Sequence, residues 1–153
     1  MANGSLSYTV SRARPADATA LVVIWEDSVR GTHPFVAEED VQFFKELLVR
    51  EKVFERMPVY ALREPETGIV GFMAANDGML DMLFVAPAHM GKGAGKVLME
   101  YALKQLSVKQ VDVNEQNADA LAFYRHFGFE VTSRSPVDGF GKPYPILHMA
   151  LQS

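Results

Sequence analysis

The segment with the clearest chemical potential is rich in glycine: residues 91–95 read GKGAG and lie between a predicted strand and a predicted helix. Glycine lets the main chain approach a ligand closely and adopt dihedral angles that other residues avoid. The start of a helix adds unpaired N–H groups and the positive end of the helix dipole. With Lys92 and Lys96 nearby, this arrangement predicts a site for phosphate or pyrophosphate. A tight turn that binds nothing has the same glycine pattern and is the alternative.

Two common nucleotide-binding loops do not fit this segment. The nucleoside-triphosphate loop G-x-x-x-x-G-K-[ST] would place Met90 at its first glycine and Val97 at its metal-binding hydroxyl. The dinucleotide fingerprint G-x-G-x-x-G/A meets Lys96 or Leu98 where it needs a small residue. Both patterns therefore fail at the residue on which their chemistry depends.

Composition excludes further classes of function. The chain of 153 residues has no cysteine, so it has no disulfide, no thiolate metal site and no cysteine nucleophile. Its four histidines show no metal-ligand spacing, and we expect no metal. A net charge of −4 argues against nucleic acid as a partner. No apolar run is long enough to span a membrane, and residues 1–5 do not resemble a signal peptide, so we expect a cytoplasmic protein.

The elements that must position the glycine-rich segment alternate between strand and helix. Apolar spacing predicts strands at residues 7–12, 59–63, 69–76, 80–85, 111–114, 129–133 and 144–151. It predicts helices at residues 17–31, 38–52 and 117–126, and another that follows the glycines. Asp17 is the expected N-cap of the first helix, and Gly128 the expected C-terminal cap of the last. We expect one domain over residues 1–153, with a central sheet flanked by helices and a final antiparallel pair of strands.

Two segments resemble the signatures of the GNAT superfamily of N-acetyltransferases. Residues 83–87 (LFVAP) and 90–95 (MGKGAG) resemble its acyl-CoA motif, and residues 117–124 (NADALAFY), continued by GF at 128–129, resemble its N-x-x-A-x-x-F-Y signature. The order of elements is also similar over nearly the whole chain. The resemblance implies a GNAT fold of the α/β (α+β) class, with a mixed central sheet of about six to seven strands and helices on both faces. It also implies acetyl-CoA as the cofactor.

Further matches are more specific within the superfamily. Residues 24–25, 28–29, 32–33, 113–117 and 141–145 resemble small bacterial acetyltransferases of the YjaB type, which implies a stand-alone enzyme that acts on amines, including protein lysines. One position departs from the superfamily pattern, because Met90 stands where glutamine or arginine is usual. The main-chain amides of the loop do not depend on that side chain. We therefore expect CoA binding to survive, with Lys92 or Lys96 supplying the missing charge.

The resemblance implies which residues hold acetyl-CoA. They come from the strand before the loop, the loop itself and the helix of the second signature: Leu83, Phe84, Val85, Met90, Gly91, Lys92, Gly93, Ala94, Gly95, Lys96, Asn117, Ala120, Phe123 and Tyr124. A bulge is expected near Phe84 and Val85, where the main-chain N–H of Val85 would polarise the thioester carbonyl. Asn117 would hydrogen-bond the pantetheine arm.

Tyr124 is the expected general acid. A phenol is protonated at neutral pH and can donate its proton to a departing thiolate. The alternative is that Tyr124 only packs in the core, because Phe123 and Phe127 lie on nearly the same helical arc. Its position in the N-x-x-A-x-x-F-Y signature favours the catalytic role.

The general base is left open between two residues. Asp81 lies in an apolar strand, where a carboxyl group has a raised pKa, but it also follows a turn at residues 77–78. His33 has a suitable pKa and lies in a loop where GNAT enzymes form the acceptor site, although a solvated loop histidine has the same sequence signal. His148 fits a structural role in the last strand, and a chain of water molecules is a further alternative.

The predicted function is N-acetyl transfer from acetyl-CoA to a primary amine, either a protein lysine or a small amine. Without cysteine, a cysteine acyl-enzyme is impossible, so we expect direct transfer in a ternary complex. Loops at residues 32–35 and 138–142 are expected to shape the acceptor pocket of a monomer or homodimer. The alternative from another class is a non-catalytic acyl-CoA-binding or regulatory module.

Overall fold

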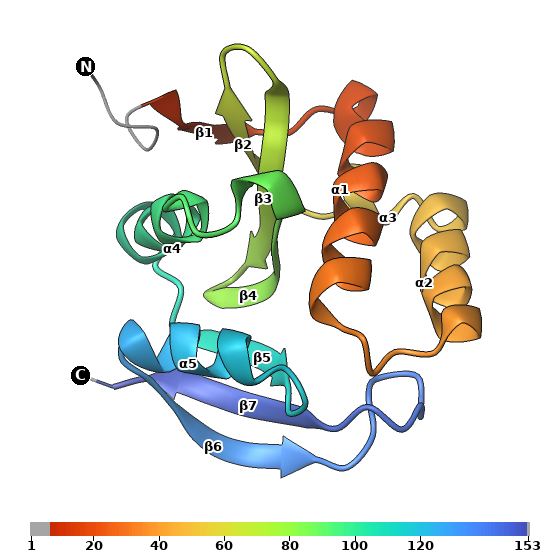
Figure 1. The fold of residues 1–153 in the computed structure, drawn as a ribbon. Coiled ribbons are helices and arrows are strands. Elements are labelled where there is room, and N and C mark those ends of the chain that lie inside the picture. Colours follow the sequence, from red (N-terminus) through yellow and green to blue (C-terminus); the bar gives the residue numbers. More distant parts are fainter. Residues whose placement is uncertain (1–6, 153) are drawn as a thin grey trace.

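A mixed sheet of seven strands, in the order β1-β2-β3-β4-β5-β7-β6, forms the centre of the molecule (Figure 1). The computed structural model describes residues 7–152, so the expectations for residues 1–5 and for the outer limits of the domain lie outside the described residues. The strands are β1 (Thr9–Arg12), β2 (Val59–Glu64), β3 (Gly68–Asn76), β4 (Met79–Val85), β5 (Gln110–Asn114), β6 (Phe129–Ser135) and β7 (Ile146–Leu151). Strands β4 and β5 are parallel, and the other neighbouring pairs are antiparallel. The predicted fold class is confirmed, including the final antiparallel pair.

Helices cover both faces of this sheet (Figure 1). They are α1 (Ala18–Thr32), α2 (Glu38–Arg50), α3 (Val53–Arg56), α4 (Ala94–Gln105) and α5 (Ala118–His126), with short 3-10 helices at Pro15–Asp17 and Pro87–His89. Alternation along β3 separates two cores: Phe72 packs with α1 and α2, whereas its neighbour Met73 packs with α4. Both side chains are fully buried, and each such burial stabilises the fold by about 1.5–3 kcal/mol.

The sheet opens between β4 and β5. These strands pair only at Met79–Gln110 and Leu80–Val111. Further along β4, the N–H of Ala86 donates to the carbonyl of Val70 at 2.8 Å. Because hydrogen-bonded pairs alternate along an antiparallel ladder, Phe84 then bonds to β3, while the N–H groups of its two neighbours point into the gap. The open side of β4 therefore offers main-chain donors to a ligand.

The predicted bulge near Phe84 and Val85 is wrong. The pairing of β3 with β4 shifts between Ala74 and Ala75, so Asp81 is the extra residue. Around Phe84 the regular alternation continues, because apolar side chains there pack into the two cores in turn. Asp81, the charged residue of β4, belongs to neither core, and the strand forms its bulge at this position.

Three local expectations also need correction. Helix α2 ends at Arg50 rather than 52, because Lys52 adopts a φ of 51° and the chain turns into α3. Asp17 occupies the N-cap position of α1, but its carboxylate accepts from the main-chain N–H of Arg14 at 2.9 Å and caps the preceding 3-10 helix instead. The last strand begins at residue 146 rather than 144. Within residues 7–152, no helix combines the length and apolar character that crossing a bilayer requires.

Candidate active site

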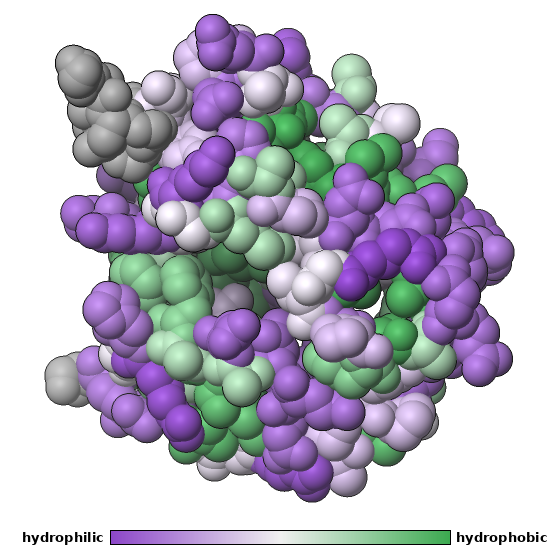
Figure 2. Space-filling model, in the orientation of Figure 1, coloured by the Kyte–Doolittle hydropathy of each residue, from purple (hydrophilic) through white to green (hydrophobic). Residues whose placement is uncertain are grey.

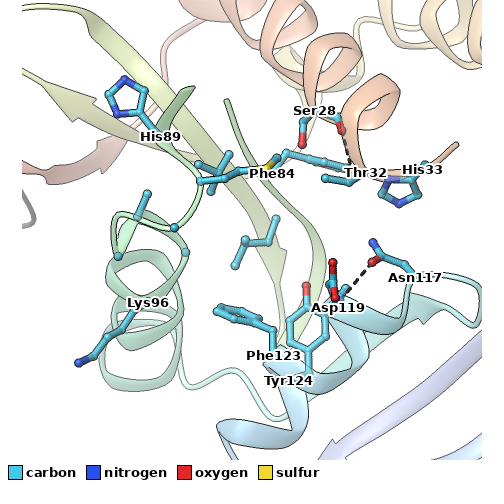
Figure 3. Close-up of a pocket in the computed structure, with 18 residues that line it drawn as sticks. Ser28, Thr32, His33, Phe84, His89, Lys96, Asn117, Asp119, Phe123 and Tyr124 are labelled. Carbon is cyan, nitrogen blue, oxygen red and sulfur yellow. Dashed lines mark hydrogen bonds between the residues drawn. The ribbon is translucent and has the colours of Figure 1, made fainter. Parts of the chain in front are cut away.

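A cavity of about 450 Å³ lies against the open end of β4, between α1, the glycine-rich loop and α5 (Figure 3). In the space-filling view, hydrophobic surface surrounds a recess between α4 and α5 (Figure 2). The cavity is lined by fourteen of the residues expected in the site: His33, Leu83, Phe84, Val85, Met90, Gly91, Gly93, Ala94, Gly95, Lys96, Asn117, Ala120, Phe123 and Tyr124. Lys92 and Asp81 are not among its lining residues. Segments far apart in the sequence therefore meet where the strands separate.

The glycine-rich loop has the geometry of an anion cradle. Gly91 and Gly93 have φ angles of 75° and 84°, which side-chain-bearing residues rarely adopt. Gly93 is the N-cap of α4, so the N–H groups of the first helical turn have no partner within the helix. A Cβ on Gly95 would lie 3.4 Å from the ring of Phe123, so a larger residue would crowd the cavity. The loop fits the pyrophosphate of CoA through its main chain, while the side chain of Lys96 extends away from the cavity (Figure 3).

Tyr124 packs in the core and also lines the cavity, so its position is compatible with both roles between which the sequence left a choice. Its ring is 7% exposed and packs against Phe123 and Phe129 with centroid distances of 5.4 and 6.2 Å. Among the described residues, no fully enclosed polar side-chain atom lacks a hydrogen-bond partner. Because no described group bonds the Tyr124 hydroxyl, that oxygen is open to the cavity, as Figure 3 shows. Burial raises the pKa of this phenol well above its usual value, so it keeps its proton at neutral pH.

A second cavity of about 200 Å³ fills the gap between β4 and β5. It shares six lining residues with the first: His33, Leu83, Phe84, Asn117, Ala120 and Tyr124. Its other walls include apolar residues of both strands and two exposed carboxylates, Asp81 and Asp112. The two cavities therefore adjoin each other at the residues that they share, which include His33 and Tyr124.

His33 is not a solvated loop residue. It is half-buried at the end of α1, and its ring lies 5.3 Å from Phe35 and 6.2 Å from Phe84. Burial lowers the pKa of the imidazole below 6.5, so the neutral form predominates at neutral pH. The side chain of Thr32 contacts its Nδ1 at 2.7 Å. A neutral imidazole between two cavities has the chemistry of a general base.

Asp81 lies in a different position from His33. The bulge leaves it exposed, and it lines only the smaller cavity. Its pKa is raised, first by partial burial and second by the negative charge of Asp112. The carboxyl group therefore faces the cavity between the strands rather than the junction.

Two other predicted residues have structural partners. The Oδ1 of Asn117 accepts from the N–H of Ala120 at 3.1 Å and caps α5, which leaves its side-chain amide N–H groups for a ligand. His148 lies between Asp112 and Ser135, with 2.7 Å on each side, and lines neither cavity. This arrangement agrees with a structural role for His148.

Thr32, from the loop expected at the acceptor pocket, also lines the larger cavity, and three further residues line it without having been expected in the site: Ser28, His89 and Asp119. The sequence contains a signal that could have identified Ser28 as a site residue. It continues the apolar stripe of α1 that includes Leu21 and Trp25, and it is only 2% exposed. A hydroxyl on the buried, apolar face of a helix requires a hydrogen-bond partner or access to a cavity. The hydroxyl-bearing Ser28 lines the larger cavity.

The family model for the acetyltransferase (GNAT) domain matches residues 33–144. The chain therefore belongs to the GNAT family of acetyltransferases and is an N-acetyltransferase that uses acetyl-CoA. It is 37% identical to the peptidyl-lysine N-acetyltransferase YjaB of Escherichia coli K12, over 93% of this chain and 95% of that protein. It is 36% identical to YjaB of Salmonella typhimurium LT2, over 94% and 98%.

Solved structures agree with this assignment. The solution structure of apo-form YjaB from Escherichia coli superimposes with a TM-score of 0.84 at 36% identity, covering 94% of this chain and 96% of that chain. The PaiA N-acetyltransferase from Thermoplasma acidophilum, solved with coenzyme A, has a TM-score of 0.67 at 19% identity, covering 93% and 98%. At that identity the likeness concerns the fold.

Proposed function

We propose that this enzyme transfers the acetyl group of acetyl-CoA directly to the side-chain amine of a lysine in a peptide or protein. The observation on which the acceptor rests is the similarity to two peptidyl-lysine N-acetyltransferases at 36–37% identity over more than nine-tenths of this chain. The geometry supports the same class. The smaller cavity, of about 200 Å³, has apolar walls such as Met82 and Ile146 and carries exposed carboxylates. An unbranched alkyl chain that ends in a cation suits such a space.

Acetyl-CoA supplies an activated carbonyl carbon and a thiolate leaving group. The loop at 91–95 and the first turn of α4 hold the pyrophosphate, and the N–H of Val85 donates to the carbonyl oxygen as it becomes negative. A preorganised donor of this kind contributes about 3 to 4 kcal/mol to lowering the barrier. Binding is therefore a property of the main chain on this side of the gap.

His33 and Tyr124 handle the protons. As the new C–N bond forms, the amine nitrogen becomes acidic and releases its proton to the unprotonated nitrogen of His33. As the C–S bond breaks, the hydroxyl of Tyr124 donates its proton to the sulfur. Solvent then carries a proton from the imidazolium to the phenolate and restores both groups. Asp81 lies off this path and contributes negative charge for the approaching ammonium.

The test is an acceptor panel with acetyl-CoA and the full-length protein. Free thiol release and mass spectrometry are measured with a lysine peptide, the same peptide with arginine in place of lysine, and a small polyamine. We expect acetylation of the lysine Nε and no reaction of the arginine peptide. Reaction of the polyamine alone would overturn the assignment of a peptide lysine as the acceptor. Thiol release that is equally fast when no amine is added would overturn both that assignment and the transfer to an amine. The proposal also places the enzyme in the cytoplasm as a monomer or homodimer, a state that light scattering measures.

A further inference from the structure

The last turn of α1 holds a chain of three polar groups. The Thr32 hydroxyl donates to the main-chain carbonyl of Ser28 at 2.7 Å, and the same oxygen lies 2.7 Å from Nδ1 of His33. A hydroxyl has a single hydrogen. Both contacts are hydrogen bonds at once only if that hydrogen goes to the Ser28 carbonyl, which can only accept, and the Thr32 oxygen accepts a hydrogen from Nδ1.

This direction decides the tautomer of the ring. In the neutral imidazole one nitrogen carries the hydrogen and the other is an acceptor. With the hydrogen on Nδ1, the lone pair is on Nε2, and no described residue hydrogen-bonds that atom. The ring itself is held between Phe35 and Phe84 and lines both cavities.

From this geometry we infer that Thr32 is a positioning residue for catalysis: it holds His33 in the tautomer whose Nε2 can accept the proton of the acceptor amine. The inference deepens the proposed function, since it specifies how the base is prepared. Thr32 itself acts through His33 rather than on the substrate. The carbonyl of Ser28 belongs to the main chain of α1, so this chain of hydrogen bonds is in place before any ligand binds.

Other ionisable groups also face the two cavities that His33 lines. Asp81 and Asp112 approach from β4 and β5, Asp119 and Tyr124 from α5, and His89 from the segment before the glycine-rich loop, whereas the side chain of Lys96 extends away from the larger cavity. None of them is hydrogen-bonded to the imidazole among residues 7–152, so Thr32 is the group that chooses between its nitrogens. These groups select no tautomer, and the pKa of His33 is lowered by burial.

The first test needs no substrate. Nitrogen-15 NMR of the free protein reports which imidazole nitrogen of His33 carries the hydrogen. We expect the Nδ1–H form in the wild type and in Thr32→Ser, which keeps the hydroxyl, and loss of that preference in Thr32→Val, which keeps the shape. Thr132→Val is the matched control, because that threonine also donates to a main-chain carbonyl but lies on β6. The Nε2–H form in the wild type would overturn the inference.

The second test is kinetic. In Thr32→Val we expect kcat/KM for the amine to fall about fivefold, the population ratio that one ordinary hydrogen bond sustains, with the affinity for acetyl-CoA unchanged. The acidic limb of the pH profile of Thr32→Val should move to lower pH. The Thr32 oxygen stabilises the imidazolium more than the neutral ring, so its removal lowers the pKa of His33. Thr32→Ser should restore both. Unchanged kcat/KM and pH profile in Thr32→Val would overturn the positioning role. Failure to acetylate any lysine peptide, with the Nδ1–H form still observed, would overturn the proposed function instead.

Discussion

The two sides of the gap between β4 and β5 are built from different parts of the chain. The side that we propose for the pyrophosphate of acetyl-CoA is made mainly of main-chain groups from one continuous stretch, the end of β4, the loop at 91–95 and the start of α4. The side that we propose for the acceptor is made of side chains from separate elements: His33 follows α1, Asp81 lies in β4, and Asp112 lies in β5. The difference predicts that a site made of main-chain amides tolerates changes of side chain, such as Met90, whereas a site made of side chains depends on each of them.

Tyr124 belongs to both sides. Its ring packs in the core with Phe123 and Phe129, and its hydroxyl opens at the junction of the two cavities. Core packing fixes the position of the acid, and burial keeps it protonated. Packing in the core is therefore compatible with the catalytic role that we propose for this side chain.

Blocking the main-chain cradle should have the largest effect. In Gly93→Glu, a side chain at a φ of 84° and a carboxylate beside the pyrophosphate site should reduce acetyl-CoA affinity more than about 100-fold, measured by calorimetry. Gly68→Glu is the matched control, because Gly68 has a φ of 82° but lies in the hairpin between β2 and β3. Equal losses in both variants would show that backbone strain, and not the cradle, is responsible.

Removing the acid at the junction should come next. Tyr124→Phe keeps the ring in the core and should lower kcat about 100-fold, the lower end of general acid–base contributions, with little change in acetyl-CoA affinity. Tyr101→Phe, on α4 and packed against Tyr60, controls for loss of a phenol elsewhere. A kcat equal to that of the wild type would remove Tyr124 from the mechanism.

The two candidate bases on the acceptor side should separate. His33→Gln should lower kcat/KM for the amine about tenfold or more, whereas Asp81→Asn should mainly raise the KM for cationic acceptors. Because burial lowers the His33 pKa, wild-type activity should fall only when the pH drops below 6.5, where the ring gains a proton. Stopped-flow thiol assays between pH 5 and pH 8 measure this limb. A limb that persists in His33→Gln and vanishes in Asp81→Asn would reverse the assignment.

The smallest expected effect concerns the stability of α5, the helix that lines both cavities. Asn117→Ala removes the side chain that caps α5 and should reduce the free energy of unfolding by about 1 kcal/mol, measured with urea. Asn117→Asp keeps an accepting oxygen and should recover most of that loss. If Asn117→Ala unfolds at the same urea concentration as the wild type, the cap contributes nothing, and the residue serves only the cavity.

Local patterns predicted most of the elements because apolar spacing reports which face of a strand or helix is buried. They did not predict the bulge at Asp81 or the break after α2 at Lys52, because each depends on how the chain meets a neighbouring element. The same limit applied to the site. The cradle was predicted from five consecutive residues, whereas the positions of Ser28, His89 and Asp119 at the same cavity were not.

The order of residues in this chain was enough to predict the glycine-rich loop, the class of the fold and the absence of cysteine chemistry, since each depends on residue types and short spacings. Folding settled the rest: which N–H groups of β4 stay open, which nitrogen of His33 keeps its lone pair, and where the hydroxyl of Tyr124 emerges. The physical reason is one of range. Main-chain cradles form from neighbours along the chain, whereas a hydrogen-bond direction or the mouth of a cavity depends on groups that only packing brings together.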